Sequence, residues 1–377
     1  MISARFHPAL DAIDAAAWNA LRADDQPFLD HAFLAGLERH GCIRPEWGWQ
    51  PHHLALHDDG ALIGAVPLYL KGNSHGEFVF DHAWAQAWER AGGRYYPKLL
   101  AAIPYTPVTG PRLLAGTGPD TAVIRERLAA ALIAETHRLG LASAHVNFIT
   151  DDACGAFDDG WLPRFDWQFH WTNQGYRDFA DFLDALSHKK RKNIRAERAA
   201  VRRTGLAIEW RCGASLDSEE WTALHRLYLA TFAEKGNHPA LSEAFFHHLG
   251  TTLGAQAWAA LARRDGRIVA MALCLGSRTT LYGRYWGSEE TLPGLHFELC
   301  YYQGIEHCIR AGLERFEPGA QGEHKLARGF LPVRTHSRHH LPHAGFRAAV
   351  AAALASEAAM LDDYGRELGA HTPYAQR

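Results

Sequence analysis

The chain has 377 residues, 47% of them hydrophobic and 21% charged, and a formal net charge of −3. This length exceeds one typical hydrophobic core and suits two domains. The near-neutral charge argues against a protein devoted to long DNA, which would be more basic. No apolar run reaches the roughly 18 residues that a membrane helix needs, so the sequence predicts a cytoplasmic protein without a membrane span.

The first half of the chain alternates between helical and strand patterns. Helical spacing of apolar residues predicts helices over residues 14–23, 31–41, 82–92 and 120–140. Alternating patterns predict a hairpin over residues 52–72 and strands over residues 76–81 and 143–149. The hairpin is expected to turn at Asp58-Asp59-Gly60. These elements together indicate an α/β arrangement.

The second half repeats this order. The patterns predict strands over residues 206–213 and 314–320, a three-stranded meander over 257–288, and helices over 218–236, 241–254 and 296–312. Ser218 is the expected N-cap of the first of these helices. The repeated order indicates an internal duplication, with a basic segment at the join.

The cysteines and histidines give no sign of a metal site. Six cysteines are scattered without a CxxC pair, and the 24 histidines include no HExxH motif. Buried cysteine behaves as a small hydrophobe, so we expect reduced thiols. The histidine spacing, even in the cluster RTHSRHH, fits no familiar zinc site, and no metal is expected.

A β-meander followed by a helix and a strand is the order of the GNAT acyltransferase fold. With two copies joined by a basic helix, the chain resembles the FemAB-like family of N-acyltransferases, which is related to the Fem peptidyltransferases. The stretches that carry the resemblance are QFHWTN, KKRKNIRAERAAVRR, YGRYWGS, HFELCYYQGIEHCI and FEPGAQGEHKLARGFLP.

The resemblance implies an α/β (α+β) fold with tandem GNAT-like domains, each a mixed, mostly antiparallel sheet flanked by helices. The expected parts are an N-terminal domain (1–170), a connecting strand and basic helix (171–205), a C-terminal domain (206–345) and a helical tail (346–377).

The basic segment between residues 187 and 205 holds four arginines at helical spacing, Arg191, Arg195, Arg198 and Arg202. A stripe of guanidinium groups suits phosphate, because the planar fork binds oxyanions bidentately. A solvated connecting helix, partly balanced by Glu197, is the alternative. We select Arg191, Lys192 and Arg195 as candidate substrate-binding residues. Because Fem relatives use aminoacyl-tRNA donors, the resemblance makes tRNA a candidate partner, whereas long DNA is not expected.

GNAT enzymes usually hold the pyrophosphate of the donor on a Gly-rich turn after the fourth strand. The corresponding stretch, GSEETLPGLHFELC, lacks a Gly-x-Gly run and carries Glu289 and Glu290, which repel phosphate. We therefore expect weak binding of coenzyme A by the second domain. Acyl-CoA and aminoacyl-tRNA both remain candidate donors, and no other cofactor is implied.

Glu298 lies in the first turn of the helix predicted over residues 296–312, with Tyr302, Ile305 and Ile309 on its face. If that face packs on the sheet, partial burial raises the pKa of Glu298 and makes it a usable general base. The alternative is a carboxylate that only stabilises the helix N-terminus.

The stretch FEPGAQGEHKLARGF concentrates polar residues just beyond a predicted strand. His324 is a candidate proton shuttle, and Lys325 is a candidate for holding a carboxylate or an oxyanion. We add Glu317 to the candidate catalytic residues and Gln321, Glu323 and Arg328 to the candidate substrate-binding residues. A hydrogen-bonded structural turn is the alternative.

Four further residues are candidate contacts for substrate. Arg284 and Tyr285 belong to the strand YGRYWGS, where Arg284 either stacks on the aromatic residues or reaches into a cleft. His170 and Trp171 are candidates for lining a groove between the domains, and ordinary core packing is their alternative.

The sequence predicts an N-acyltransferase that moves an acyl or aminoacyl group to the amine of a small molecule or peptide. The alternative is a non-catalytic GNAT-like module that binds a peptide, a nucleotide or tRNA. We place the site in the groove between the domains, with Glu298 and residues 317–328 on the side of the second domain. The reason is that the fourth and fifth strands of a GNAT sheet splay apart and open a cleft.

Overall fold

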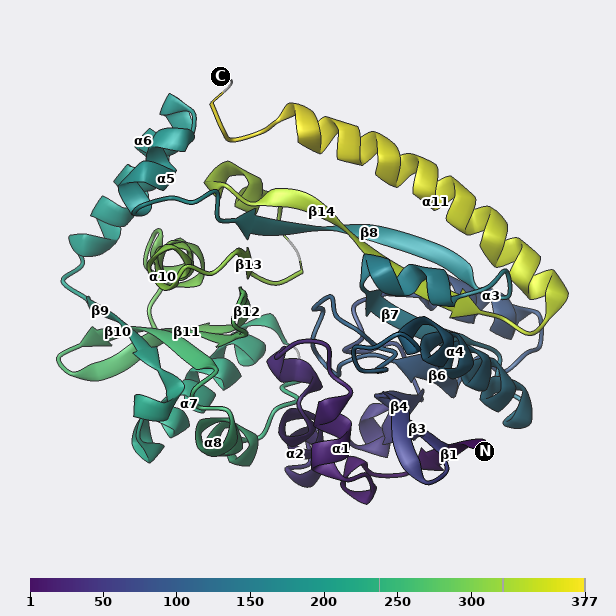
Figure 1. The fold of residues 1–377 in the computed structure, drawn as a ribbon. Coiled ribbons are helices and arrows are strands. Elements are labelled where there is room, and N and C mark those ends of the chain that lie inside the picture. The colour runs from purple at the N-terminus through teal and green to yellow at the C-terminus, as the bar shows by residue number, and fades with distance from the viewer. Residues whose placement is uncertain (237, 321, 376–377) are drawn as a thin grey trace. The chain divides into compact units, whose positions relative to one another are not determined.

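The computed structural model describes residues 1–236, 238–320 and 322–375 (Figure 1). The chain forms two compact units, one of Met1–Trp167 with Arg334–Tyr364 and one of Gln168–Val333 with Gly365–Arg377. Strands β8 (Leu162–Thr172) and β14 (Leu331–His340) each pass from one unit to the other. The predicted domain boundaries assume contiguous domains, and they stay predictions.

The first unit contains two sheets. A three-stranded antiparallel sheet has the order β1-β3-β4, and a mixed sheet has the order β2-β5-β6-β7-β14-β8. The strands not yet defined are β1 (Ile2–His7), β2 (Trp49–Pro51), β3 (His53–Asp58), β4 (Ala61–Val66), β5 (Leu68–Lys71), β6 (Lys98–Ala101) and β7 (Ala144–Ile149). The helices are α1 (Ala15–Ala20), α2 (His31–Arg39), α3 (His82–Arg90), α4 (Thr121–Arg138) and most of α11 (Ala344–Ala370).

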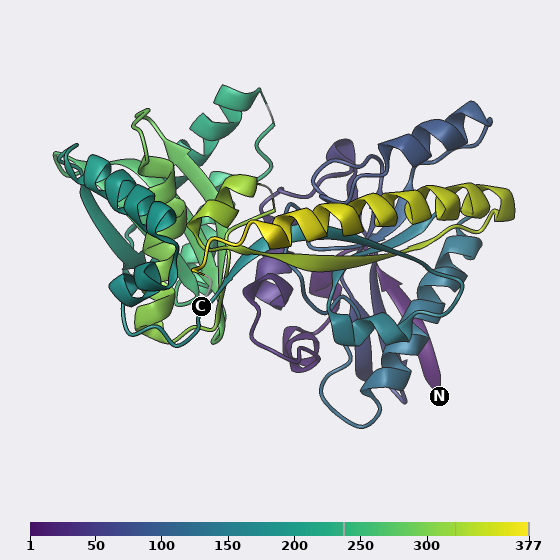
Figure 2. The same cartoon turned by 90° about the horizontal axis from the view of Figure 1, so that it is seen from above.

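Apolar faces of the helices hold the first unit together. Leu128 and Leu132 of α4 are buried in the core formed with strands β3 to β7. Helix α11 runs along β8 and β14 (Figure 2), and its Phe346 and Val350 pack in a cluster with Trp84 of α3. Burial of such side chains supplies most of the stabilisation of helices in proteins.

Residues 76–81, all of which are described, form no strand, so that prediction is wrong. Glu77 and Asp81 instead turn inward, and their carboxylates each accept a hydrogen bond of 2.6 Å from the buried ammonium of Lys98 on β6. The segment is shaped by this ion cluster, because a buried ammonium requires paired charges.

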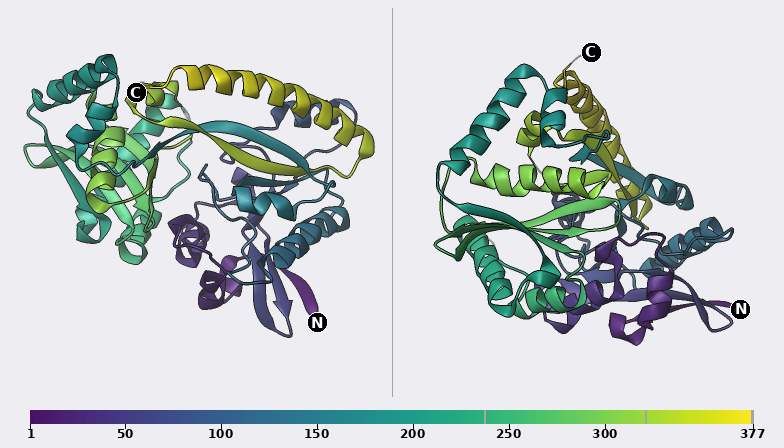
Figure 3. Two further views of the ribbon diagram at one scale, coloured as in Figure 1. Left: turned by 45° about the horizontal axis from the view of Figure 1, so that its top comes forward. Right: turned by 60° about the vertical axis from the view of Figure 1, so that its left-hand side comes forward.

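The second unit is built on one mixed sheet, in which the end of β8 is followed by β13, β12, β11, β10 and β9. The predicted meander is confirmed as antiparallel β10, β11 and β12. Helices α7 and α10 lie on opposite faces of this sheet (right panel of Figure 3). The strands are β9 (Ala207–Cys212), β10 (Ala257–Arg264), β11 (Arg267–Gly276), β12 (Thr280–Ser288) and β13 (Arg315–Glu317).

The helices of the second unit are α5 (Phe179–Ala185), α6 (His188–Arg202), α7 (Ser218–Lys235), α8 (Glu243–Thr252), α9 (Leu295–Phe297) and α10 (Gln303–Ala311). Asp217, and not Ser218 as predicted, is the N-cap of α7. Its side chain accepts from the amide of Glu220, whose carboxylate accepts in return from the amide of Asp217. This reciprocal capping box satisfies two helix-end donors at once.

Each unit contains a parallel strand pair bridged by a helix. Strands β6 and β7 are joined through α4, and strands β12 and β13 through α9 and α10. This repeat, with mixed and mostly antiparallel sheets flanked by helices, confirms the predicted α/β class and the repeated order of elements.

Among the described residues, α11 alone has the length and composition of a membrane span, with a mean hydropathy of 1.3 over its most apolar window. Of that window, 17% is buried. The absence of a membrane span and a cytoplasmic location stay predictions.

Gly287 of β12 lies against helix α7, where an added Cβ would overlap the carbonyl oxygen of Leu227. Backbone cannot yield as a side chain does, so we expect Gly287→Ala to lower the free energy of unfolding by about 2 kcal/mol. In the same unit, a Cβ at Gly369 of α11 meets nothing within 4 Å. Gly369→Ala should leave the free energy of unfolding unchanged or raise it slightly. If urea unfolding shows the same loss of stability in both variants, the close contact at Gly287 is not the cause.

Candidate active site

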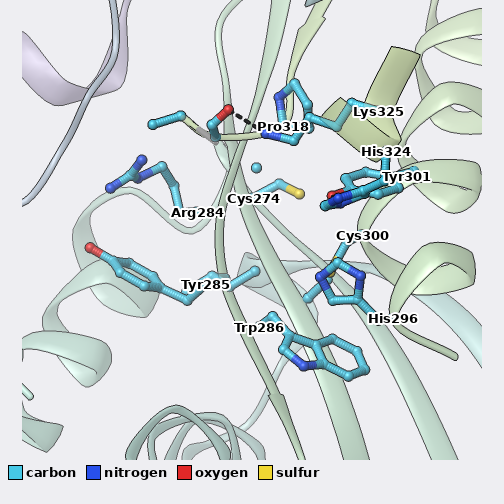
Figure 4. A pocket seen from close by; sticks show the side chains of 15 residues that line it. Cys274, Arg284, Tyr285, Trp286, His296, Cys300, Tyr301, Pro318, His324 and Lys325 are labelled. Carbon is cyan, nitrogen blue, oxygen red and sulfur yellow. Dashed lines mark hydrogen bonds between the residues drawn. The ribbon is translucent and has the colours of Figure 1, made fainter. Parts of the chain in front are cut away.

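A pocket of about 240 Å³ opens where β12 and β13 part (Figure 4). The two strands pair in parallel at three positions, the last of which joins Tyr282 to Glu317. Beyond it, residues 283–286 and 318–320 both line the pocket. At Gly283 the strands are still close, since an added Cβ would lie 3.2 Å from the Cα of Pro318. The predicted splaying of these strands is thus present in the second unit.

A β-bulge places Arg284 on the pocket wall. Leu273 of β11 lies opposite Tyr285, whereas Cys274 lies opposite Gly283, so Arg284 is the extra residue of β12. Bulges re-aim side chains and are common beside active sites. Figure 4 shows Arg284 and Tyr285 on one side of the pocket and Tyr301 and His324 on the other.

The helical segment after β12 forms another wall. It contains a π-helical turn, Glu298–Tyr302, between α9 and α10. π-Helical turns are rare in proteins, and those that occur are often found at functional sites. Within or next to this turn, His296, Cys300 and Tyr301 line the pocket. None of these three was predicted from the sequence, although the density of aromatic and polar residues in HFELCYY is a signal for them.

His324 and Tyr301 form a hydrogen-bonded pair on the pocket wall. The hydroxyl of Tyr301 and Nε2 of His324 are 2.8 Å apart. Burial, with smaller contributions from Arg328 and Lys325, lowers the pKa of His324 below its usual value. Burial also raises the pKa of Tyr301 far above its usual value. At neutral pH the imidazole is therefore uncharged and the phenol keeps its proton.

Lys325 is a buried cation that lines the same pocket. Its side chain is 2% exposed, and Nζ donates a hydrogen bond of 2.6 Å to the carbonyl of Gly319. Burial lowers the pKa of Lys325 to about 8. None of the described carboxylate side chains forms an ion pair with it. A buried ammonium without a carboxylate partner is costly, so a negatively charged group bound beside Lys325 would be favoured.

Glu298, the predicted general base, is buried but is not among the residues that line the pocket. Its carboxylate accepts hydrogen bonds from Arg198 of α6, at 2.9 to 3.2 Å, and from Gln303 at 2.8 Å. It therefore faces α6, where it is fully engaged in holding that helix. Its catalytic role stays a prediction.

The basic helix α6 does not present its arginines as one solvent-facing stripe. Arg191 donates to Asp184 at 2.7 Å and Arg195 lies 3.8 Å from the same carboxylate, while Lys192 is exposed. Arg198 turns inward to Glu298. Phosphate binding by the exposed residues stays a prediction.

The remaining predicted residues that the structure describes do not line the pocket. His170 and Trp171 are buried at the end of β8, and burial lowers the pKa of His170 to about 3. Nε2 of His170 is 4.0 Å from the carboxylate of Glu317 at the end of β13. Glu323 is exposed at the start of the 3₁₀ turn Glu323–Arg328, and Arg328 is buried at its end. Gln321 lies outside the described residues.

In the loop after β12, the sequence predicts that Glu289 and Glu290 repel phosphate. Both carboxylates have arginine partners, which weakens that repulsion. Arg264 binds the carboxylate of Glu290 through two hydrogen bonds of 2.7 Å, and Arg267 and Arg226 both pair with Glu289. The two acidic side chains are thus neutralised locally.

Among the described residues, no group of three His, Cys, Asp or Glu side chains is placed to hold a metal.

A family model named FemAB-like, described as peptidoglycan biosynthesis/recognition, matches residues 9–376. No curated protein sequence matches the chain. The C-terminal domain (DUF2156) of a putative lysylphosphatidylglycerol synthetase from Agrobacterium fabrum has a similar structure, with a TM-score of 0.55 and 13% identity over 91% of this chain and 97% of that one.

Two further solved structures are similar. A conserved protein of unknown function from Bacteroides thetaiotaomicron has a TM-score of 0.52 and 10% identity, covering 90% of this chain and 99% of that one. The L-PGS of Bacillus licheniformis has a TM-score of 0.50 and 11% identity, covering 85% and 93%. At such identities the likeness establishes the fold alone.

Buried lysines with and without counter-ions should respond oppositely to replacement. Lys325→Met removes an unpaired buried charge, so we expect the free energy of unfolding at pH 7 to rise by about 1 kcal/mol. Lys98→Met leaves Glu77 and Asp81 without their partner and should lower it by about 3 kcal/mol. Urea unfolding monitored by tryptophan fluorescence measures both. Destabilisation by Lys325→Met would show that Lys325 is satisfied within the protein.

Proposed function

The chain belongs to the FemAB-like family, and from this membership and the pocket we propose that it is an N-acyltransferase. It moves an acyl or aminoacyl group onto the amine of a small molecule or peptide. The nitrogen attacks the carbonyl carbon of a thioester or ester, a C–N bond forms, and the C–S or C–O bond to the leaving group breaks. The required groups are an acceptor for the ammonium proton and donors for the oxyanion.

The observation that carries the proposal is the unpaired ammonium of Lys325 on the pocket wall. The tetrahedral intermediate of acyl transfer bears one negative charge on oxygen, and this charge pairs with the ammonium of Lys325. A preformed and buried cation stabilises such a charge more strongly than a cation in water would. Lys325 therefore gains a counter-ion only as the reaction proceeds, which favours the transition state over the ground state.

The pair of His324 and Tyr301 supports the proton transfer. His324 is uncharged at neutral pH, so its imidazole can accept a proton from the attacking amine and pass it to the leaving group. The hydroxyl of Tyr301 fixes the ring orientation through the 2.8 Å hydrogen bond. The nearby ammonium of Lys325 also lowers the pKa of an incoming amine, which favours its nucleophilic form.

We prefer His324 to Glu298 as the proton acceptor. His324 lines the pocket, whereas Glu298 is bound by Arg198 and Gln303 on the side of α6. The donor, acyl-CoA or aminoacyl-tRNA, and the acceptor amine are left to the assay.

Single-turnover transfer from radiolabelled acetyl-CoA or from mixed aminoacyl-tRNAs to a panel of amines tests the proposal. His324→Gln and Lys325→Met should each reduce the rate about a hundredfold or more, because each removes a group that acts on the reacting atoms. Glu298→Gln should reduce it much less if Glu298 is an anchor of α6. Binding of a donor or an amine without any turnover would instead support the non-catalytic module.

The proposal also predicts a bell-shaped dependence of the rate on pH. The rate should rise as His324 loses its proton, below the usual histidine range because its pKa is lowered. It should fall above about pH 8, because Lys325 then loses the charge that stabilises the oxyanion. Lys325→Arg keeps its charge to above pH 12 and should remove the alkaline limb. An alkaline limb that persists in this variant would assign it to another group.

A further inference from the structure

Glu197 of α6 contacts both elements that carry the proposed proton-transfer pair. Its Oε1 accepts a hydrogen bond of 2.7 Å from Nη2 of Arg328, and its Oε2 accepts one from the hydroxyl of Tyr302. Arg328 ends the 3₁₀ turn that carries His324, and Tyr302 follows Tyr301 in the π-helical turn. One carboxylate thus joins the two segments behind the pocket.

Arg328 transmits this contact to His324. Its Nη1 donates to the carbonyl oxygen of His324 at 2.8 Å, and its Nε donates to the hydroxyl of Tyr302 at 3.0 Å. The guanidinium carbon lies 3.4 Å from the centre of the Phe297 ring. Every face of this buried cation is therefore fixed, and the turn that bears His324 is fixed with it. Arg328, predicted to bind substrate, is engaged inside the protein.

Charge explains why Glu197 matters more than a neutral spacer. Arg328 is 8% exposed, and among the ion pairs of the described residues Glu197 is its carboxylate partner. Removing the carboxylate leaves a buried guanidinium without a counter-ion, which must then move toward water. That movement releases the carbonyl of His324 and the hydroxyl of Tyr302 together. The hydrogen bond between His324 and Tyr301 depends on both segments staying in place.

We propose that Glu197 is a positioning residue that acts through Arg328 and Tyr302 to set the hydrogen bond between His324 and Tyr301. The inference rests on the proposed function for its catalytic meaning, although the contacts stand without it. Helix α6, which follows β8 and α5 and precedes β9, is then a part of the active site.

The adjacent ion pairs of α6 supply a matched control. Arg198 binds Glu298 at 2.9 Å and Glu306 of α10 at 2.9 Å, so Glu306 helps to hold the same helix. Glu306 makes none of the contacts to Arg328 or Tyr302 described above. Glu306→Gln therefore weakens the docking of α6 without touching the link to His324.

The experiment compares Glu197→Ala, Glu197→Gln and Glu306→Gln by unfolding, by steady-state kinetics and by NMR titration of the His324 imidazole. We expect Glu197→Ala to raise the titration midpoint of His324 by about half a pH unit, toward its usual value, as the turn becomes more solvated. In Glu197→Ala, kcat should fall about tenfold while KM changes less than about twofold, because the mutation weakens an interaction that is made in the transition state and not in substrate binding. Glu197→Gln keeps an acceptor oxygen, so its His324 titration midpoint and its kcat should both lie closer to those of the wild type. Glu306→Gln should change neither the midpoint nor kcat.

An unchanged His324 titration in Glu197→Ala would overturn the inference, and so would an equal change in Glu306→Gln, because the role of Glu197 would then be structural only. If the wild-type protein transfers no acyl group from any donor, the proposed function fails. The titrations still decide whether Glu197 positions His324, so the two failures are distinguishable.

Discussion

The short parallel pairing of β12 with β13 is the constraint on which the second unit depends. The pairing brings the two strands so close that a Cβ at Gly283 would make a tight contact of 3.2 Å with the Cα of Pro318, and it ends at Tyr282 and Glu317. Beyond these residues the backbone N–H and C=O groups of the two strands no longer pair with each other. Because buried polar groups need partners, they must find other ones. Pocket, bulge and π-helical turn all lie at this point of divergence, so the geometry of the site follows from where the ladder stops.

The two buried lysines show how one residue type serves opposite purposes. Lys98 of the first unit is held by two carboxylates, which keep its pKa above the usual value although burial opposes them. Lys325 of the second unit has a backbone carbonyl as its described partner, and its pKa is lowered. Lys98 therefore organises the fold locally, whereas Lys325 has no described carboxylate to offset the cost of burying its charge. A protein retains such a cost where the strained group serves function.

Local periodicity predicted the meander and the long helices, because their burial patterns repeat over many residues. It failed at residues 76–81, whose charged ends are directed by Lys98, a partner distant in sequence. In the site, spacing predicted that Glu298 lies on a buried helix face beside the reacting groups. Glu298 is buried, but its carboxylate binds Arg198 of α6, whereas Tyr301 lines the pocket. Sequence spacing indicates which residues share a face and does not reveal what that face meets.

The crossings of β8 and β14 make the two units interdependent in the order of synthesis. The ribosome completes the sheet of the second unit before it makes residues 334–364, which the first unit still lacks. Until then β7 has no β14 beside it, and its ladder groups are open to other strands. The unit whose translation begins first is therefore completed last, because its final strand and helix are made after the sheet of the second unit.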